Sequence, residues 1–412
     1  MLCASIVVGM WQATSQGGTT LTIATHYTDE QRAPLTSCID EYERLNPGMT
    51  IVHRQLSYRD FLQTLFMARI GGAVPDIYNL ANMWTAQLVQ SGSLAEPSPE
   101  ISNFVRRNYL TETSGTAIEQ QVWGIPAEVN VYMLLYNKLL FAKAGLTRPP
   151  ATWDQLVHDA AKISRTNRQG QLTVAGFGFG PNPAMVVNPF IALLYSHGET
   201  LFSPDRRSTN LTSNSAREVL EGQVRLFRTR GTSLGATPTQ FPSGTLGMMI
   251  VPNWYKNELL QTLGERFADK VGVAPIPGGT NWRTVQYGFF WAVDTNSRNK
   301  TEAWKLLQWL NTPHVPGHRS CVGDMLFRLG ALTRNKADLA ASADELGHPF
   351  MKPFADALSD GRALPLDSIP HSNEIEELLR SYIEEAWLGL LPPDEALRKA
   401  DIAIGSILRE SD

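Results

Sequence analysis

An aromatic pair stands at a corner of the chain where recognition chemistry is possible. Trp254 and Tyr255 follow the apolar segment LGMMIVP and precede an expected helix, with Asn253 and Asn257 beside them. A pyranose ring presents apolar C–H faces that pack on aromatic rings, and hydroxyl groups that each need a hydrogen-bond partner once water is removed. We therefore expect Trp254, with Tyr255 and Asn253, to contact a sugar-like ligand. The alternative is that Trp254 only packs between two parts of the protein.

Other candidate ligand contacts lie near the ends of segments that we expect to be strands. Asn82, Met83 and Trp84 follow the apolar segment DIYNLA, although Trp84 has an alternative role as an inward-packing residue of the next helix. Glu128 and Asn130 are two residues apart, which places them on one face of a strand. The remaining candidates are His26, Tyr27, Phe179, Asn182, Tyr287, Gly288, Phe289, Arg362, His371 and Ser372.

The motifs that would indicate catalysis or metal binding lack the context they need. Residues 231–235 spell G-x-S-x-G, but a helical pattern precedes Ser233, whereas a nucleophile elbow needs a strand before the serine and a helix after it. His314 and His318 are four apart, yet Pro316 and Gly317 break any shared helix face. The acidic pairs at 376–377 and 384–385 are expected on solvated helical positions. We expect no catalytic group, metal or cofactor.

The bulk composition bounds the classes of protein. A chain of 412 residues exceeds one compact core and predicts two or three domains at about 150 residues each. A hydrophobic fraction of 43% with 18% charged residues excludes disorder. The net charge of -4, without a basic stripe, argues against nucleic acid as a partner. Of the three cysteines, Cys38 and Cys321 form either a disulfide or two buried free thiols; both remain open.

The N-terminus carries an apolar run from Leu2 to Trp11, which has the length of the hydrophobic part of an export signal and is too short to span a bilayer. No basic residue precedes it, because the first is Arg32. We interpret residues 1–19 as an export-signal remnant or linker; the alternative is a buried first strand. Cys3 precedes most of the run, so no Leu-x-x-Cys lipobox follows it and lipid anchoring stays in doubt.

The elements that would position the candidates alternate between strand and helix. TLTIATHYT alternates like a strand, and Thr28 with Gln31 has the form of a capping box that opens a helix toward Asn46. A second strand, a second helix and the strand near VPDIYNLA follow, which predicts a mostly parallel α/β lobe. The span 173–278 repeats this alternation and predicts a second such lobe. Four tryptophans on helical patterns are expected in the cores: Trp153, Trp304, Trp309 and Trp387.

Five segments carry a family resemblance by their order and spacing. They are NPGMTIVHRQLSYRDFLQTLFMARIGGAVPDIYNL, GIPAEVNVYMLLYNKLLFAKAGLTRPPATWDQL, FPSGTLGMMIVPNWY, VGVAPIPGG and AWKLLQWLNTP. In this order the chain resembles the extracellular solute-binding proteins of carbohydrate-type ABC importers, from about Thr20 to the C-terminus. Within that family it looks most similar to actinobacterial amino-sugar and glycerophosphodiester-type binding proteins.

The resemblance implies a fold class, a division into domains and a function. It implies α/β architecture with two Rossmann-like lobes joined by hinge strands, of the type II periplasmic binding protein kind. Lobe I would comprise 20–126 plus 284–335, lobe II would comprise 127–283 plus 336–412, and the ligand would sit in the cleft between them. The implied function is an extracytoplasmic receptor, expected to be monomeric, that captures a carbohydrate or amino sugar and delivers it to an ABC permease.

The class of ligand remains open between a glycerophosphodiester and an amino sugar, and an enzymatic activity remains an alternative to binding alone. A glycerophosphodiester would need a cation or helix amides near its phosphate, for which Arg362 and the helix start at Trp254 are candidates. An amino sugar would need a carboxylate near its nitrogen, for which Glu128 is the candidate. A secreted carbohydrate-active enzyme is the alternative from another class, and it would require an exposed pair of carboxylates in the cleft.

Overall fold

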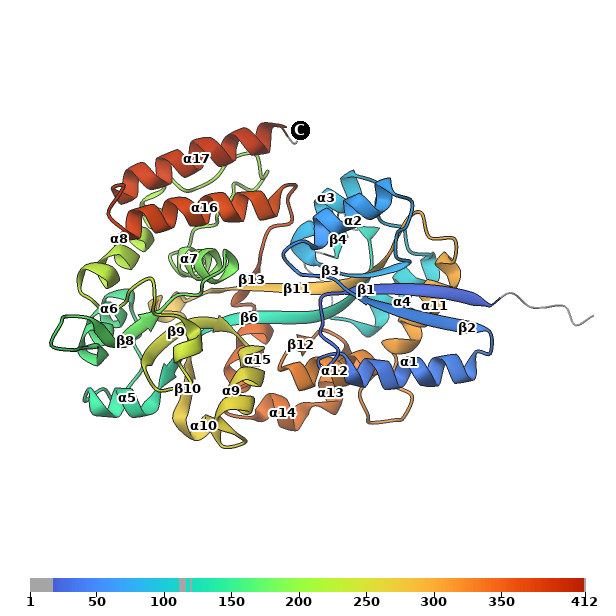
Figure 1. Cartoon of the computed structure of the whole chain (residues 1–412), viewed down its shortest axis with the longest axis horizontal. Helices are drawn as coiled ribbons and strands as arrows, with labels where there is room; N and C mark the ends of the chain where they lie inside the picture. The colour runs from blue at the N-terminus through green and yellow to red at the C-terminus, as the bar shows by residue number, and fades with distance from the viewer. Residues whose placement is uncertain (1–17, 111–115, 119–120, 411–412) are drawn as a thin grey trace, which may run out of the picture.

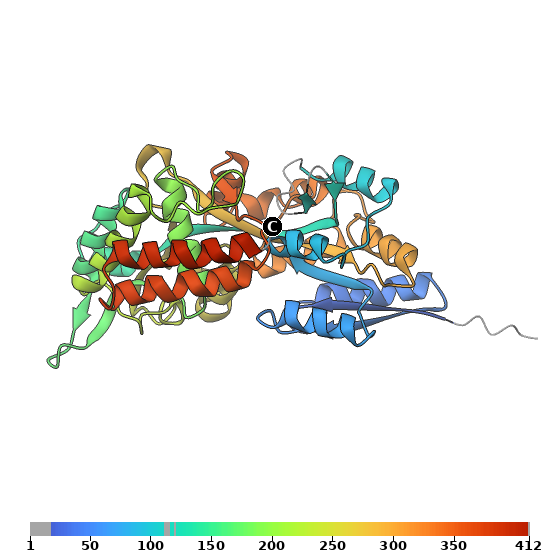
Figure 2. The same ribbon diagram turned by 90° about the horizontal axis from the view of Figure 1, so that it is seen from above.

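The computed structural model describes residues 18–110, 116–118 and 121–410 (Figure 1). The expected export signal therefore lies outside the described residues, apart from its last positions. Figures 1 and 2 show an elongated molecule with two lobes, which confirms the expected two-lobed α/β fold class. In Figure 1 the blue lobe I occupies the right side, and the green and red lobe II occupies the left side.

One mixed sheet runs through both lobes. Its strand order is β2-β1-β3-β11-β6-β9-β8-β7, with β10 and β12 also pairing with β6, and β13 pairing with β11; β4 and β5 form a separate hairpin. The strands are β1 (Thr19–Thr25), β2 (Met49–Gln55), β3 (Ile77–Ala81), β4 (Ala117–Ile118), β5 (Gln121–Val122), β6 (Ile125–Asn137), β7 (Arg165–Thr166), β8 (Leu172–Gly178), β9 (Leu246–Pro252), β10 (Val271–Ala274), β11 (Thr284–Val293), β12 (Leu332–Thr333) and β13 (Ala363–Pro365).

Helices cover both faces of this sheet, as parallel strands require. The helices within residues 33–196 are α1 (Ala33–Leu45), α2 (Phe61–Ile70), η1 (Asn82–Trp84), α3 (Thr85–Gln90), α4 (Pro99–Asn108), α5 (Lys138–Lys143), α6 (Trp153–Ile163) and α7 (Ala184–Ser196). The remainder are α8 (Asn214–Arg228), η2 (Pro238–Gln240), α9 (Tyr255–Leu263), α10 (Phe267–Lys270), η3 (Gly279–Asn281), α11 (Lys300–Leu310), α12 (Cys321–Leu329), α13 (Lys336–Ala341), α14 (Ala343–Gly347), α15 (Lys352–Ser359), α16 (Ser372–Trp387) and α17 (Pro393–Glu410).

The expected start of lobe I forms as the sequence predicts. β1 pairs in parallel with both β2 and β3. The capping box also forms, since the Thr28 amide donates to Gln31 Oε1 at 2.9 Å and the Gln31 amide donates to Thr28 Oγ1 at 3.3 Å. Regular helix nevertheless begins only at Ala33, after a turn, and Pro34 stands in its first turn. The box therefore orders the approach to α1.

Two strands, β6 and β11, connect the lobes. β6 pairs with β9 over Tyr132–Tyr136, whereas β11 pairs with β3 over Phe289–Val293. The two strands pair with each other over Ile125–Val131 and Gln286–Trp291. A bulge lies at Gly288, where an added Cβ would stand 2.4 Å from the carbonyl oxygen of Glu128. Only glycine permits this approach of the two backbones. The lobe boundaries at 126/127, 283/284 and 335/336 remain a prediction.

Each lobe has its own apolar core. Trp291, Trp304 and Leu307 lie in a cluster of lobe I, and Phe177, Phe190 and Trp387 lie in one of lobe II. The expectation for tryptophans on helical patterns is confirmed, because Trp153, Trp304 and Trp387 are buried and Trp309 packs against the lobe I cluster. Among the described residues, no helix is long and apolar enough to cross a membrane, and no cluster of three metal-ligand side chains occurs.

A disulfide joins Cys38 of α1 to Cys321 at the start of α12. Of the two alternatives left open by the sequence, a disulfide or two free thiols, the structure contains the disulfide. The bridge connects positions 283 residues apart and so restricts the unfolded chain over a long loop.

We expect reduction of this disulfide to lower the free energy of unfolding by about 2–4 kcal/mol, because the unfolded chain regains the entropy of the open loop. Urea denaturation of the oxidised and reduced protein measures the difference. The Cys38→Ala/Cys321→Ala variant serves as the control, since a reductant should leave its stability unchanged. Equal stability of the oxidised and reduced wild type would contradict the expectation.

Candidate functional site

Aromatic rings of lobe I gather at the junction of the lobes. Tyr58, in the loop between β2 and α2, stacks on Trp84 with ring centroids 5.3 Å apart. His26 stacks on Phe289 at 4.4 Å, and Tyr58 lies 5.9 Å from Phe289. Trp84 is fully buried, whereas Tyr58 keeps 40% of its surface exposed. Surrounding protein still raises the pKa of the Tyr58 hydroxyl by desolvation. Tyr58 therefore offers an exposed ring that stacks on a buried tryptophan.

Trp254 extends this aromatic surface onto lobe II. It forms the N-cap of α9, is 38% exposed, and donates from Nε1 to the Tyr287 hydroxyl at 2.7 Å. Tyr287 lies on the connecting strand β11, 6.2 Å from Phe289 and 6.0 Å from Tyr132. We call Tyr58, Trp84, Phe289, Tyr287 and Trp254 the aromatic belt. It passes from one lobe to the other along β11.

A buried carboxylate lies beside the belt. Glu128 is 7% exposed, accepts from the Tyr27 hydroxyl at 2.9 Å, and accepts from Asn130 Nδ2 at 3.0 Å. Burial raises its pKa to about 7, while these two hydrogen bonds oppose the rise. A cavity of about 20 Å³ adjoins it and is also lined by Tyr287 and Arg334. Glu128 therefore lies where β6 and β11 pair.

Because of this raised pKa, Glu128 should make stability fall as pH rises. Between the pKa of an unfolded glutamate, 4.5, and about 7, the folded carboxyl keeps a proton that the unfolded one has lost. The free energy of unfolding therefore falls across this pH window, by roughly 3 kcal/mol in total, at about 1.4 kcal/mol per pKa unit. We expect Glu128→Gln to remove this fall, so the variant should gain stability over wild type from pH 4.5 to pH 8.

Urea denaturation across this pH range measures the difference. Glu41→Gln is the control, because Glu41 is exposed and pairs with Arg44 at 3.3 Å, so its difference from wild type should change little with pH. A stability difference for Glu128→Gln that stays flat between pH 4.5 and pH 8 would contradict the expectation.

Asn253 ties the corner before Trp254 to two neighbouring segments. Its side chain is fully buried, accepts from the Val131 amide at 2.6 Å, and donates to the Gly330 carbonyl at 2.7 Å. A longer contact of 3.4 Å joins Asn253 Nδ2 to Asn130 Oδ1. The asparagine thus fixes the end of β9 against β6 and against the turn after α12.

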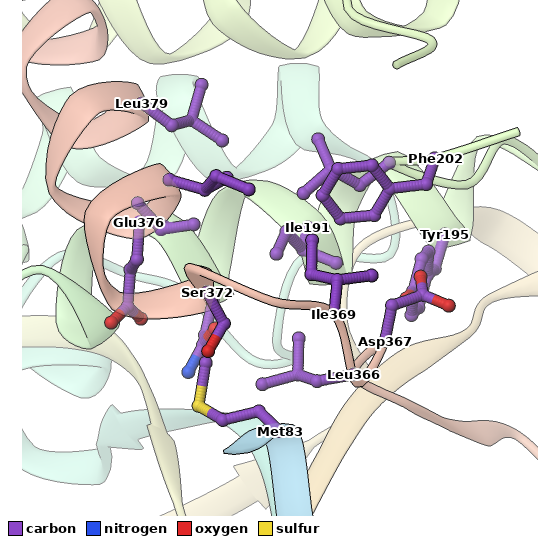
Figure 3. Close-up of a pocket in the computed structure, with 14 residues that line it drawn as sticks. Met83, Ile191, Tyr195, Phe202, Leu366, Asp367, Ile369, Ser372, Glu376 and Leu379 are labelled. Atoms are coloured by element: carbon purple, nitrogen blue, oxygen red, sulfur yellow. The ribbon is translucent and has the colours of Figure 1, made fainter. Parts of the chain in front are cut away.

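A second carboxylate stands at the start of α16. Glu376 is half-buried, and burial together with the charge of Glu377 raises its pKa to about 7. It lines a cavity of about 40 Å³ with Met83 of lobe I and with Asn188 and Ser372 of lobe II. Figure 3 shows Met83, Ser372 and Glu376 on one side of this cavity, with Phe202 and Tyr195 on the other. The solvated position expected for Glu376 is therefore wrong, because α16 packs this face toward α7 and lobe I.

Direct hydrogen bonds cross between the lobes near this cavity. Trp84 Nε1 donates to Asn373 Oδ1 at 2.8 Å, and the Ala86 amide donates to Ser368 Oγ at 2.9 Å. Ser368 Oγ also donates to the Met83 carbonyl at 3.3 Å. In this conformation the segment 83–86 of lobe I is therefore already attached to the segment 368–373 of lobe II.

The structure brings most of the expected site residues to this junction. Asn82 accepts from the Gly288 amide at 3.2 Å, Ser372 lines the larger cavity, and Glu128 lines the smaller one. The expected residues that lie at the belt, the cavities or the Asn253 network are His26, Tyr27, Asn82, Met83, Trp84, Glu128, Asn130, Asn253, Trp254, Tyr287, Gly288, Phe289 and Ser372.

Five expected residues are placed elsewhere. Phe179 packs in the core of lobe II, 4.2 Å from the ring of Trp387, because its side chain completes an aromatic cluster there. Tyr255 is buried and donates to the Pro238 carbonyl at 2.7 Å. Asn182 caps the turn at the Met185 amide. His371 is exposed beside Glu374.

The fifth of these residues is Arg362, which stabilises a loop. Its guanidinium donates to the Trp282 carbonyl at 3.1 Å and lies over the Trp282 ring at 5.0 Å. This placement argues against Arg362 as the phosphate contact that a glycerophosphodiester would need.

Several residues of the junction were not anticipated from the sequence. Tyr58 stands in a polar loop, Tyr132 inside an apolar strand, Asn188 inside an apolar helix, and Asn373 with Glu376 on an acidic helix. For Tyr58, a signal was present, since an aromatic residue precedes a helix there as at Trp254. For the others the sequence holds no signal, because only packing decides which face of α7 or α16 meets the other lobe.

Comparison with known proteins places this architecture in a family. The family model for bacterial extracellular solute-binding proteins matches residues 27–315. A binding protein of Brucella abortus is 27% identical over 389 residues, covering 90% of this chain and 88% of the relative.

Solved structures share the fold over nearly the whole chain. The GacH receptor of Streptomyces glaucescens, solved unliganded and with acarbose, has a TM-score of 0.80 at 19% identity and covers 96% of this chain and all of its own. A solute-binding protein from Thermotoga lettingae bound to α-D-tagatose has a TM-score of 0.80 at 22% identity, covering 95% of this chain and 100% of that one. The resemblance stated from the sequence is thereby confirmed: the chain belongs to the bacterial extracellular solute-binding proteins.

Proposed function

We propose that this protein captures a carbohydrate or amino sugar at the junction of its lobes and delivers it, as a monomer outside the cytoplasm, to an ABC transporter permease. The observation that carries the proposal is the aromatic belt. Its two exposed rings, Tyr58 and Trp254, belong to different lobes. Flat aromatic faces with adjacent amide and carboxylate groups match the apolar faces and hydroxyl rim of a sugar.

The connecting strands support a mechanism of lobe closure. Rotation about β6 and β11 would bring Tyr58 of lobe I and Trp254 of lobe II onto the same solute and exclude water. The Trp84–Asn373 hydrogen bond joins the lobes in this conformation, so contacts between the lobes contribute to the free energy of closure alongside contacts with the solute. A solute that contacts both walls binds the closed state more tightly and shifts the population toward it. An affinity near 1 μM corresponds to about -8 kcal/mol.

The solutes of related structures support a sugar-like class. The GacH receptor binds acarbose and the Thermotoga lettingae protein binds tagatose. For this chain an amino sugar is consistent with Glu128 and Glu376 at the junction. A glycerophosphodiester has less support, since Arg362 binds the loop at Trp282.

One observation keeps a carbohydrate-active enzyme as the second candidate. Glycoside hydrolysis uses two carboxyl groups, one of them protonated, and Glu128 and Glu376 both have a pKa raised to about 7 by burial. Both oxygens of Glu128, however, are engaged by Tyr27 and Asn130, which leaves it poorly placed to attack.

A ligand screen of the purified protein tests the proposal. Intrinsic tryptophan fluorescence and thermal shift should be recorded with neutral monosaccharides, disaccharides, amino sugars and glycerophosphodiesters. We expect saturable binding of a sugar class and recovery of the unchanged sugar after release. Binding of none of these classes would overturn the proposal, and release of hydrolysis products would favour the enzyme.

Export and membrane attachment belong to the same proposal. An extracytoplasmic location is supported by the family of extracellular proteins to which the chain belongs. Lipid anchoring stays a question for the N-terminal segment, which lies outside the described residues. Mass spectrometry of the protein purified from membranes and from the soluble fraction would detect an attached lipid.

A further inference from the structure

We propose that the solute carries a cationic nitrogen, and that this nitrogen binds to Glu376 beside Ser372, at the cavity between α16 and Met83. The inference rests on the proposed function, because it assumes that the solute binds at the junction of the lobes. It goes further by assigning a position and a charge to one substituent of that solute.

Glu376 lacks the cation that its acidic neighbours have. Glu377 and Glu384 both pair with Arg380, at 3.2 and 2.9 Å. Asp367, which lines the same cavity, pairs with Arg206 at 3.0 Å. Within the described part of the chain, no ion pair or hydrogen bond is found for the Glu376 carboxylate.

The surroundings of Glu376 make an ionised carboxylate costly without a partner. From other elements, the hydroxyls of Tyr58 and Tyr132 feel its charge, and Glu377 repels it along the same helix. Burial and this repulsion raise its pKa. A bound ammonium group would offset both costs, because an opposite charge stabilises the ionised form.

A second polar group at the cavity also lacks a partner. Ser372 is 4% exposed and lines the cavity, and its hydroxyl oxygen is buried without a hydrogen-bond partner in the described structure. An ammonium group has three donors and no acceptor. It could therefore donate to the Glu376 carboxylate and to Ser372 Oγ together, which satisfies both groups with one substituent.

The size and lining of the cavity limit what enters it. A volume of about 40 Å³ holds a group of a few heavy atoms, since one water needs about 10–15 Å³. The sugar ring would stay outside, at the aromatic belt. Apolar side chains, among them Met83 and Ile191, make up most of the lining. Trp84 donates to Asn373, three residues before Glu376 in the chain. The carboxylate of Glu376 would attract a cation, whereas a phosphate would meet the same carboxylate and be repelled.

Matched pairs of sugars test the inference. Dissociation constants for glucose against glucosamine, and for galactose against galactosamine, should be measured by calorimetry at pH 7 with wild type, Glu376→Gln and the control Glu384→Gln, which removes a carboxylate of the same helix that pairs with Arg380. We expect wild type and the control to prefer the amino sugar by at least about tenfold. Glu376→Gln should lose most of this preference while keeping its affinity for the neutral sugar. Ser372→Ala should reduce the preference by a smaller factor, of about threefold.

The outcomes separate this inference from the proposed function. If wild type binds the neutral sugar as tightly as its amino counterpart, or if Glu376→Gln weakens both equally, the inference fails while the receptor function stands. If wild type binds no sugar of either kind and none in the broader screen, both fail. Thermal melting provides the folding check, because removal of a buried charge should leave the melting temperature of Glu376→Gln unchanged or higher.

Discussion

Replacement of Trp254 by alanine should weaken solute binding by about 100-fold, which corresponds to roughly 2.7 kcal/mol. The variant removes an exposed ring that forms one end of the aromatic belt, and it also removes the hydrogen bond that orients Tyr287. A stacked aromatic ring contributes both buried apolar area and a defined geometry. Calorimetry with the best solute from the screen measures the loss, since fluorescence would change with the loss of the tryptophan itself.

A conservative variant separates the two contributions of Trp254. Trp254→Phe keeps a flat ring but has no N–H to donate to the Tyr287 hydroxyl, so we expect an intermediate loss of about three- to tenfold. Trp309→Phe, at a ring that packs on Tyr42 and His314 rather than on the belt, should leave affinity unchanged. Undiminished affinity in Trp254→Ala would show that the ring packs against the protein without contacting the solute.

Replacement of Asn253 by alanine should lower the free energy of unfolding by about 3–5 kcal/mol. The change leaves the Val131 amide and the Gly330 carbonyl without their partners, and each buried unsatisfied group costs roughly 1–3 kcal/mol. The lost side-chain volume adds a cavity at a site with no exposure. Urea denaturation followed by fluorescence and by circular dichroism measures the loss and tests whether both lobes unfold together.

Asn257 supplies the matched control for this prediction. It lies four residues further along, on helix α9, and is partly exposed. Asn257→Ala should change stability by less than about 0.5 kcal/mol, as surface substitutions usually do. If Asn253→Ala were as stable as Asn257→Ala, the hydrogen bonds of Asn253 would not hold the corner before Trp254, and the rigid placement of that tryptophan would need another cause.

Local patterns in the sequence predicted the elements well. The parallel start of lobe I, the capping box at Thr28 and the strand-to-helix corner at Trp254 depend on neighbouring residues, and the structure contains all three. Side chains that end a strand also had a predictable place, because the ends of adjacent strands meet at one edge of a sheet. This is why Asn82, which directly follows β3, lies at the junction.

The sequence misled at two positions, Phe179 and Glu376, where burial depended on a distant partner. Phe179 and Trp254 both follow apolar strands, yet Phe179 is covered by Trp387 of α16 while Trp254 remains exposed. Glu376 and Glu377 are adjacent acidic residues of one helix, and only the packing of α16 decides that the first faces the cavity. No local pattern distinguishes the members of these pairs.

The sequence alone determined the fold class, the alternation of strands and helices, and the family, since these follow from periodicity, turn residues and the order of motifs along the chain. The tertiary structure decided the pairing of Cys38 with Cys321 and the meeting of Tyr58 with Trp84. It also decided the burial of Glu376 beside Met83. These contacts join residues far apart in the chain, and they exist only after both lobes have packed against β6 and β11.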